Sequence, residues 1–173
     1  KLEYVDDEVN VYNVLLSAWK FCFSIAQKRE IALHNRLPES RVHVLSEYDQ
    51  LVQVMRNLLE NAIKFSPEGG EICVYAEENS DEWIVSVQDN GPGISKKDLG
   101  RIFERFYRAE LYRNGDKISG TGLGLAICRH IIRNHNGRIW VESPLPGELR
   151  GSVFKFALKK AKSKKVTQEH VEP

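Results

Sequence analysis

Four short motifs in the middle of the chain constrain its fold more than any other feature of the sequence. They are Asn57-Leu-Leu-Glu-Asn61, Asp89-Asn-Gly-Pro-Gly93, Phe103-Glu-Arg-Phe106 and Gly120-Thr-Gly-Leu-Gly124. A polar helix face, an acidic glycine-rich turn, an aromatic pair and a glycine-rich helix start are each weak evidence. Their order and spacing together indicate one ligand, a nucleotide with several phosphates.

Composition and charge limit the class of protein. Of the 173 residues, 42% are hydrophobic and 28% are charged, which is sufficient for one domain with a substantial core. The 25 basic and 24 acidic side chains give a formal charge of +1, so no overall field predicts a nucleic-acid partner or an anionic membrane. Cys22, Cys73 and Cys128 lack metal-ligand spacing and are predicted to be buried thiols.

The two ends of the chain are expected to lie outside the domain, which should span residues 9–158. Residues 1–8 form a charged segment typical of a linker from a preceding element, and residues 159–173 have the composition of a basic, polar tail. No apolar run approaches the ~20 residues that a bilayer span needs. We therefore expect a cytoplasmic fragment without direct membrane contact, whether or not the parent protein is anchored in a membrane.

Hydrophobic periodicity predicts three helices. Residues 9–28 and 121–135 carry apolar side chains at helical spacing, and a third helix begins at Ser46 or Asp49 and ends near Ser66. Its buried stripe is predicted to be Leu51, Val54, Met55, Leu58, Leu59, Ala62 and Ile63. Strands are predicted at residues 31–37, 41–45, 71–77, 82–88, 138–142 and 152–158, and a short helix at 97–106.

Helices and antiparallel strands occur in segregated runs, which favours an α+β fold over a doubly wound one. We expect a two-layer α/β sandwich in which a mixed, mostly antiparallel sheet packs on three helices. Residues 107–119 are polar, contain Gly115 and lack periodicity, so this segment is predicted to be a mobile lid.

The polar face of the second long helix is the first candidate binding surface. Asn57, Asn61 and Lys64 lie at positions i, i+4 and i+7, on one exposed face opposite the apolar stripe. Amide oxygens are suitable ligands for Mg²⁺, and a lysine suits the terminal phosphates of a nucleotide. An ordinary solvated helix face would carry the same residue types, so this motif alone does not distinguish a binding surface from a solvated one.

Asp89 ends an apolar strand and is followed by a turn in which glycines allow close backbone approach. A carboxylate in this position can accept a hydrogen bond from the amino group of adenine. The alternative is an Asx turn that only closes a loop.

The glycines of residues 120–124 lead directly into a helix, whose first N–H groups and positive dipole end can face phosphate oxygens. A Walker loop is excluded because no Lys-Ser/Thr pair follows, and a dinucleotide fingerprint is disfavoured because no strand leads into the glycines. The alternative is a flexible loop before a helix.

Phe103 and Phe106 flank Glu104-Arg105 on the predicted short helix and join the lid to the body of the domain. Burial of the two rings would set the position of the lid, while Arg105 or Arg108 reaches the γ-phosphate. The alternative is that both rings only fill the core.

These motifs, with the flanking segments Ile102-Phe-Glu-Arg-Phe-Tyr-Arg108 and Gly137-Arg-Ile-Trp-Val-Glu-Ser143, resemble the catalytic ATP-binding (HATPase_c) domain of bacterial sensor histidine kinases. That domain belongs to the GHKL superfamily, which includes gyrase, chaperone and mismatch-repair ATPases. The four motifs match its N, G1, F and G2 boxes, and the resemblance covers about residues 9–158. It implies a Bergerat-type ATP-binding fold with ATP and Mg²⁺ as ligands.

The resemblance also implies residue roles. Asn61 would bind Mg²⁺ with assistance from Asn57, Lys64 and Arg108 would meet the phosphates, and Asp89 would select adenine. Glu60 stands where an acidic residue is frequent, and its role is open. The remaining implied nucleotide contacts are Phe65, Ile94 and Tyr107 around the base and ribose, Gly91 and Gly93 in the turn, and Gly120, Thr121, Gly122, Leu123, Gly124 and Leu125 at the lid and helix start.

The family reaction, as the resemblance implies it, moves the γ-phosphoryl group of ATP to a histidine on a helical dimerisation domain, with ADP as product. The phosphoryl group then passes to an aspartate in the receiver domain of a response regulator. The five histidines here lack the His-Glu/Asp-x-Arg-x-Pro setting of an acceptor; they are His34, His43, His130, His135 and His170. We therefore expect ATP binding without autophosphorylation, a monomeric isolated domain, a homodimeric parent, and a partly exposed face at Phe103 and Phe106. Residues 1–8 would be the end of the dimerisation helix and its linker.

Three alternatives stay open. An anti-sigma-type serine/threonine kinase shares the nucleotide site, but the intact F box and the long lid argue against it. A non-catalytic nucleotide-sensing module is disfavoured because no metal- or phosphate-contacting position is degraded. A gyrase-like ATPase would require a glutamate where Asn57 stands.

Overall fold

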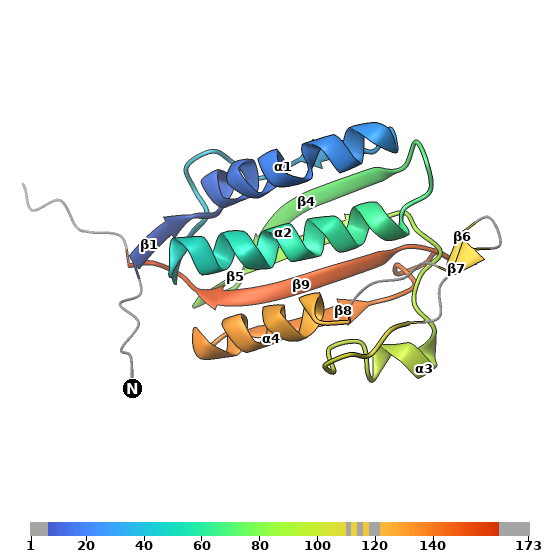
Figure 1. Ribbon diagram of the computed structural model, residues 1–173. Coiled ribbons are helices and arrows are strands. Elements are labelled where there is room, and N and C mark those ends of the chain that lie inside the picture. The colour runs from blue at the N-terminus through green and yellow to red at the C-terminus, as the bar shows by residue number, and fades with distance from the viewer. Residues whose placement is uncertain (1–6, 110–111, 114–115, 118–121, 163–173) are drawn as a thin grey trace, which may run out of the picture.

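A five-stranded sheet with long helices on one face forms the framework of the computed structural model (Figure 1). The structure describes residues 7–109, 112–113, 116–117 and 122–162. The strand order is β2-β4-β5-β9-β8, and every neighbouring pair is antiparallel except β2–β4. The strands are β2 (Ala32–Asn35), β4 (Glu71–Glu78), β5 (Glu82–Asp89), β9 (Ser152–Lys159) and β8 (Arg138–Glu142). The predicted α+β fold with a mixed, mostly antiparallel sheet is confirmed.

Three helices cover this sheet, as the hydrophobic periodicity predicts. In Figure 1, α1 (Val11–Lys28), α2 (Tyr48–Phe65) and α4 (Gly124–Asn134) lie in one layer, with α2 between the other two. Helix α2 packs against both α1 and α4 and against β5. The core therefore lies between the helical layer and the sheet, and the middle helix carries the first of the candidate motifs.

Helix α2 buries the whole predicted stripe, since each of its seven apolar residues is almost inaccessible to solvent. Its N-cap is Glu47, not Ser46 or Asp49 as the sequence suggested. The carboxylate of Glu47 accepts hydrogen bonds from the backbone N–H groups of Asp49 (3.1 Å) and Gln50 (2.8 Å). Ser46 is not available as a cap because it is the buried last residue of a strand.

The two short strands predicted on either side of Pro38 do not pair with each other. Strand β2 joins the main sheet, whereas β3 (His43–Ser46) pairs with β1 (Asp7–Asn10) in a separate antiparallel ribbon. Asp7 and Glu8, which the sequence analysis placed in a linker, are thus strand residues. Pairing over a distance of about 35 residues leaves no local signal in the sequence, because the partner of a strand is set by the fold.

The helix predicted at residues 97–106 is much shorter than expected. Helix α3 (Lys96–Leu99) ends at Gly100, and residues 101–106 form successive turns. Phe106 has φ +62°, a left-handed conformation that cannot continue a right-handed helix. Its backbone N–H instead donates to the carbonyl oxygen of Gly122 at 2.9 Å, so the aromatic motif is anchored to the start of α4.

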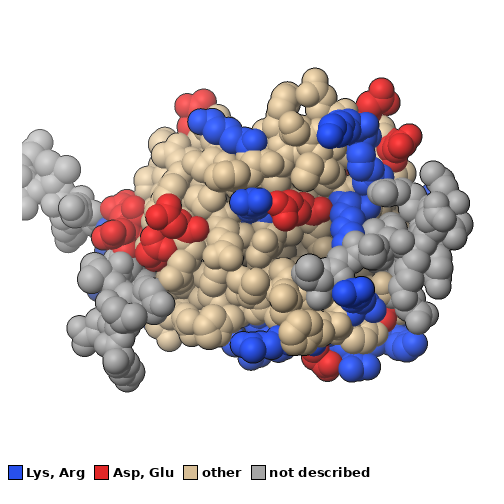
Figure 2. Space-filling view, viewed as in Figure 1, with Lys and Arg blue, Asp and Glu red and all other residues tan. Residues whose placement is uncertain are grey.

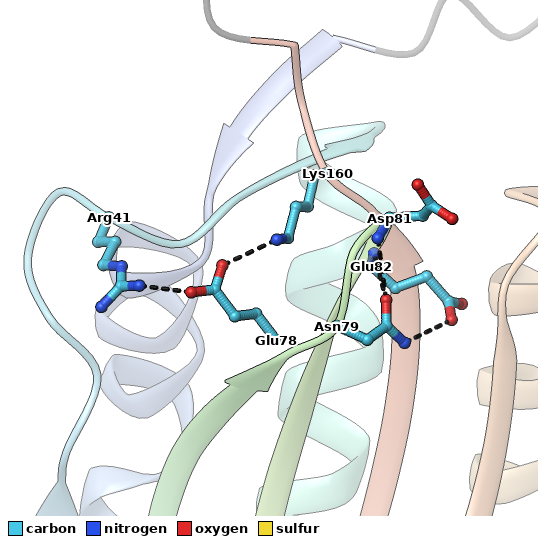
Figure 3. Close-up of polar contacts among 6 residues, drawn as sticks. All are labelled: Arg41, Glu78, Asn79, Asp81, Glu82 and Lys160. Atoms are coloured by element: carbon cyan, nitrogen blue, oxygen red, sulfur yellow. Dashed lines mark hydrogen bonds and ion pairs between the residues drawn. The ribbon is translucent and has the colours of Figure 1, made fainter.

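A cluster of charged residues fastens the end of the sheet that lies away from α3 (Figure 3). Glu78 pairs with Arg41 and, at 2.8 Å, with Lys160, and both cations lie 5.5 Å from the centre of the Trp83 ring. Beside it, Asn79 closes the β4–β5 hairpin, because its Oδ1 accepts hydrogen bonds from the backbone N–H groups of Asp81 (3.0 Å) and Glu82 (2.8 Å). Three segments distant in sequence are thereby joined at one corner.

Candidate nucleotide-binding site

A cavity of about 270 Å³ lies between the second half of α2, residues 102–109 and the beginning of α4. Most of its lining residues belong to the predicted site. The lining consists of Asn57, Glu60, Asn61, Lys64, Phe65, Ile102, Tyr107, Arg108, Ala109, Gly122, Gly124 and Leu125. The sequence analysis assigned no role to Ile102 and Ala109, which are buried and resemble ordinary core residues in the sequence.

The two asparagines of α2 differ in their hydrogen bonds. Asn57 donates from Nδ2 to the carbonyl oxygen of Gly124 at 3.3 Å, which leaves its amide oxygen as the acceptor end. The Nδ2 atom of Asn61, one turn later, is buried and has no hydrogen-bond partner within the described residues. A buried polar group without a partner is costly and commonly marks a position that a ligand, ion or water completes.

Two cations, Lys64 and Arg108, face the same cavity. Burial lowers the pKa of Lys64, and the positive charge of Arg108 lowers it further. Like charges in proximity repel, so this pair is destabilising by itself and is relieved by an anion. Arg105, the other arginine considered for the phosphate, is exposed and does not line the cavity.

Arg29, the residue after α1, holds the last turn of α2. Its guanidinium donates to the carbonyl oxygens of Ile63, Lys64 (3.2 Å) and Ser66, which the end of a helix would otherwise leave without hydrogen bonds. This contact fixes the turn that carries Lys64 and Phe65 into the cavity.

Glu60 lines the cavity but its carboxylate is engaged on the outer side of α2. Its Oε1 accepts a hydrogen bond from Nε of Arg56 at 2.8 Å, and the Arg56 guanidinium lies 4.7 Å from the centre of the Phe21 ring. The negative charge is therefore partly neutralised beside a site that is proposed for anions.

Asp89 lies at the end of β5 and is 4% exposed. Its Oδ1 accepts a hydrogen bond from the backbone N–H of Gly91 at 2.9 Å, which is the Asx-type turn that the sequence left as an alternative. Burial raises the pKa of this carboxyl to about 6, against the opposing effect of backbone hydrogen bonds from Gly91 and Ser152. Ser152, opposite Asp89 on β9, was not among the predicted site residues.

The turn after Asp89 does not line the cavity but adjoins it. A Cβ atom on Gly91 would lie 2.6 Å from the carbonyl oxygen of Phe65, so only glycine permits this contact between the turn and the end of α2. Gly93 and Ile94 follow in the same turn and do not line the cavity either. The predicted residues thus fall into two groups, one that lines the cavity and one in the adjoining turn.

The beginning of α4 meets the aromatic motif closely. Gly122 has φ +72°, and a Cβ atom there would lie 2.7 to 2.8 Å from the backbone of Phe106. Leu123 is the N-cap residue, without a capping side-chain hydrogen bond, and Gly124 begins the helix. Gly120 and Thr121, two further predicted contacts, lie outside the described residues, so the phosphate-binding interpretation of this loop rests on residues 122–125.

The segment predicted as a lid begins at a firmly held tyrosine. The hydroxyl of Tyr107 donates to Asp98, whose other carboxylate oxygen accepts from Ser95 at 2.9 Å. Further on, β6 (Tyr112–Arg113) and β7 (Asp116–Lys117) form a two-residue antiparallel pair, and the rest of residues 110–121 lies outside the described part of the chain. The predicted mobility of the lid is untested.

The aromatic pair divides between core and surface. Phe103 is partly buried and meets Phe154 edge to face, with ring centres 6.1 Å apart, whereas Phe106 is 71% exposed. Of the histidines, His34, His43 and His130 are surface or half-buried residues, His135 is buried against the end of α4, and His170 lies outside the described residues.

The space-filling view shows Lys and Arg side chains gathered towards the right-hand end of the helical face, which is also the end where α3 and β6–β7 lie in Figure 1 (Figure 2). Two cations, Lys64 and Arg108, share a cavity with the amides of Asn57 and Asn61, and the buried carboxylate of Asp89 lies on the adjoining turn. This arrangement is typical of a nucleotide-binding ATPase domain. Residues 46–162 match the histidine kinase-, DNA gyrase B- and HSP90-like ATPase family, and the chain belongs to this family.

Sensor histidine kinases are among the proteins to which this chain is similar. The sensor histidine kinase WalK of Bacillus subtilis is 37% identical over 79% of this chain and 22% of that protein. Cyanobacterial phytochrome A of Nostoc is 45% identical over 78% of this chain and 16% of that protein. The catalytic domain of histidine kinase ThkA is 30% identical with a TM-score of 0.75, over 89% of this chain and 97% of that structure. The predicted resemblance to histidine kinase catalytic domains is confirmed, and the chain spans less than a quarter of these two curated relatives.

None of the described helices has both the length and the apolar composition that a bilayer crossing requires.

Proposed function

We propose that this chain is the ATP-binding catalytic domain of a sensor histidine kinase that donates the γ-phosphoryl group of ATP to a histidine on a separate dimerisation domain. The observation that carries this proposal is the convergence of Asn57, Asn61, Lys64 and Arg108 on one cavity. Amides and cations in one cavity suit the polyphosphate and its metal, and Asp89 on the adjoining turn suits adenine.

The residues present fit Mg²⁺. Asn57 uses its Nδ2 for the bond to Gly124, which leaves its amide oxygen to ligate a metal. Asn61, whose Nδ2 is buried without a hydrogen-bond partner in the described residues, would offer its amide oxygen to Mg²⁺ and its Nδ2 to a phosphate oxygen. Asn61 and Asn57 would supply part of the Mg²⁺ shell and the phosphates the remainder, because Mg²⁺ is usually bound by few protein oxygens together with substrate phosphates. When bound, Mg²⁺ would neutralise phosphate charge during transfer.

The chain's own side chains have distinct tasks in this proposal. Lys64 and Arg108 offset the charge of the terminal phosphates, which also relieves their mutual repulsion. Asp89 accepts a hydrogen bond from the adenine amino group, and Phe65 and Tyr107 border the base and ribose. Glu60, held by Arg56, points its charge away from the phosphates.

The acceptor and the next partner lie on other domains. ThkA, at 27% identity in this comparison, has been solved in complex with the response regulator TrrA, and full-length ShkA, at 25% identity, in complex with AMPPNP. By analogy, the phosphoryl group would pass from the acceptor histidine to an aspartate of a response regulator receiver domain. The isolated domain would be a cytoplasmic monomer, and its parent a homodimer.

Calorimetric titration with a non-hydrolysable ATP analogue, with and without Mg²⁺, tests the binding step. The native chain should bind, Mg²⁺ should tighten binding, and Asp89→Asn should abolish it. Asp81→Asn is the matched control, because Asp81 is exposed on the β4–β5 hairpin at the opposite corner (Figure 3). Absence of binding to the native chain would contradict an active kinase and favour a degenerate, non-catalytic regulatory module.

Transfer is tested by incubating the chain with γ-labelled ATP and the dimerisation domain of its parent. Label should appear on a histidine of that domain and not on the catalytic chain alone. Label on a serine or threonine of a partner protein would instead support the anti-sigma type of kinase.

A further inference from the structure

The turn that follows Asp89 is fastened to the connection between β8 and β9. The backbone N–H of Ile94 donates to Oγ of Ser143 at 2.7 Å, and the N–H of Gly151 donates to the carbonyl oxygen of Gly91 at 2.8 Å. Ser143 itself donates to the carbonyl oxygen of Gly151 at 2.8 Å. The Ser143 hydroxyl therefore holds the Ile94 end of the turn directly, and through Gly151 it is linked to the Gly91 end.

The Ser143 hydroxyl has one hydrogen to donate, and this determines which of its neighbours must donate to it. Since that hydrogen is given to Gly151, the 3.0 Å contact between Oγ of Ser143 and Oγ of Ser152 requires Ser152 to donate. Ser143 then accepts two hydrogen bonds and donates one, which is close to its full capacity. Ser152 is also the residue opposite Asp89 in the β5–β9 ladder, so the network reaches the carboxylate from two directions.

Close packing leaves the turn little freedom to shift without breaking this network. Gly93 has φ +87°, and a Cβ atom there would lie 3.1 Å from Oγ of Ser143. Gly151 has φ +84°, and a Cβ atom there would lie 2.6 Å from Leu145 and 2.9 Å from the carbonyl oxygen of Asp89. The Ser143 hydroxyl thus lies against Gly93 and hydrogen-bonds to the backbone of Ile94 and of Gly151.

We propose that Ser143 is a positioning residue that holds the turn after Asp89 in place and thereby sets the preference of the site for adenine over guanine. The N–H of Gly91, inside that turn, is the group that orients the Asp89 carboxylate at 2.9 Å. Adenine presents an amino donor at the position where guanine presents an oxygen acceptor, so an oriented carboxylate accepts from the first and repels the second. The inference rests on the proposed ATP site.

The test compares Ser143→Ala with the native chain for binding of non-hydrolysable ATP and GTP analogues, well below the unfolding temperature. Loss of the two accepted hydrogen bonds should weaken ATP binding about tenfold. GTP binding should change by less than about twofold. The ratio of ATP affinity to GTP affinity therefore falls. Ser143→Thr keeps the hydroxyl and should restore most of the ratio.

Ser86→Ala is the matched control. Ser86 is a fully buried serine on the same strand as Asp89, and its hydroxyl has no hydrogen-bond partner within the described residues. Its removal should leave both affinities unchanged. Should Ser143→Ala not fold, Ser143→Cys carries the comparison, since sulfur keeps the side-chain size with weaker hydrogen bonding.

Three outcomes are distinguishable. A lower ATP-to-GTP ratio in the alanine variant, restored by threonine, supports the positioning role. An unchanged ratio in a folded variant, whether both affinities are equal to native or both are reduced together, would overturn it. Failure of the native chain to bind either analogue would instead overturn the proposed function, together with the inference that depends on it.

Discussion

Asn57 donates a hydrogen bond to the carbonyl oxygen of Gly124 at 3.3 Å and so joins the polar face of α2 to the first residue of α4. Asn61, one turn further, has a buried Nδ2 atom without a partner in the described structure. Two asparagines of one motif therefore make opposite contributions to the stability of the free domain. Asn57 stabilises a helix contact, whereas Asn61 is costly until a ligand is bound.

Alanine substitutions should separate these contributions. Asn57→Ala should lower the free energy of unfolding by about 1 kcal/mol, because a side-chain hydrogen bond is lost. Asn61→Ala should leave it unchanged or raise it, since an unsatisfied polar group is removed from the interior. Both should lose Mg²⁺-dependent nucleotide binding. Urea unfolding and calorimetry measure the two effects, and a strongly destabilised Asn61→Ala would contradict the assignment.

The features that the sequence predicted well are those determined by local periodicity. The seven-residue stripe of α2 is visible because apolar residues recur on one helix face, and Asp89 is visible because it ends an apolar strand. The pairing of β1 with β3 and the contacts of Ser143 and Ser152 depend on segments that meet only in the folded chain. The helix predicted at residues 97–106 is longer than α3, which ends at Leu99, and the left-handed Phe106, whose N–H bonds the carbonyl oxygen of Gly122, likewise depends on a contact of the folded chain.

Gly122→Ala should disrupt the junction between the aromatic motif and α4. A Cβ atom would lie 2.7 Å from the Phe106 backbone, in addition to the strain of φ +72°. Gly147→Ala is the matched control, with φ +77° but nothing within 4 Å of the added Cβ. Both should lose about 1 kcal/mol of stability from backbone strain, but only Gly122→Ala should weaken ATP binding. Equal nucleotide affinities in the two variants would refute the junction's role.

Asp89 should make stability fall as the pH rises through the range of its titration. The pKa of its carboxyl is about 6 in the folded chain and 3.8 ordinarily, so the folded state holds this proton more tightly. The stabilisation of the fold by the protonated Asp89 carboxyl is fully present below pH 3.8 and is lost as the pH rises through about 6. Asp89→Asn should remove this step and be more stable than the native chain at pH 7, by up to about 3 kcal/mol. Urea unfolding at a series of pH values measures the difference, and parallel curves for the two proteins would contradict it.

Arg108 and Arg105 offer a test of which cation meets the phosphates. Arg108 lines the cavity beside Lys64, whereas Arg105 is exposed outside it. Arg108→Ala should weaken ATP binding by about fivefold or more and ADP binding less, because a charged contact to the terminal phosphate is lost. Arg105→Ala should bind both nucleotides like the native chain. Comparable losses in the two variants would indicate a general effect of surface charge.

Glu78 should matter for stability but not for nucleotide binding, because it lies at the corner of the sheet away from α3 (Figure 3). It pairs with both Arg41 and Lys160, which flank the Trp83 ring. Glu78→Gln should lower the unfolding temperature slightly at low salt and not at high salt, since surface ion pairs are screened. Glu77→Gln, one residue earlier on β4 and without an ion pair in the described residues, is the control and should show no salt-dependent loss. A reduced ATP affinity in Glu78→Gln would mean that this corner is coupled to the site, contrary to the separation between them.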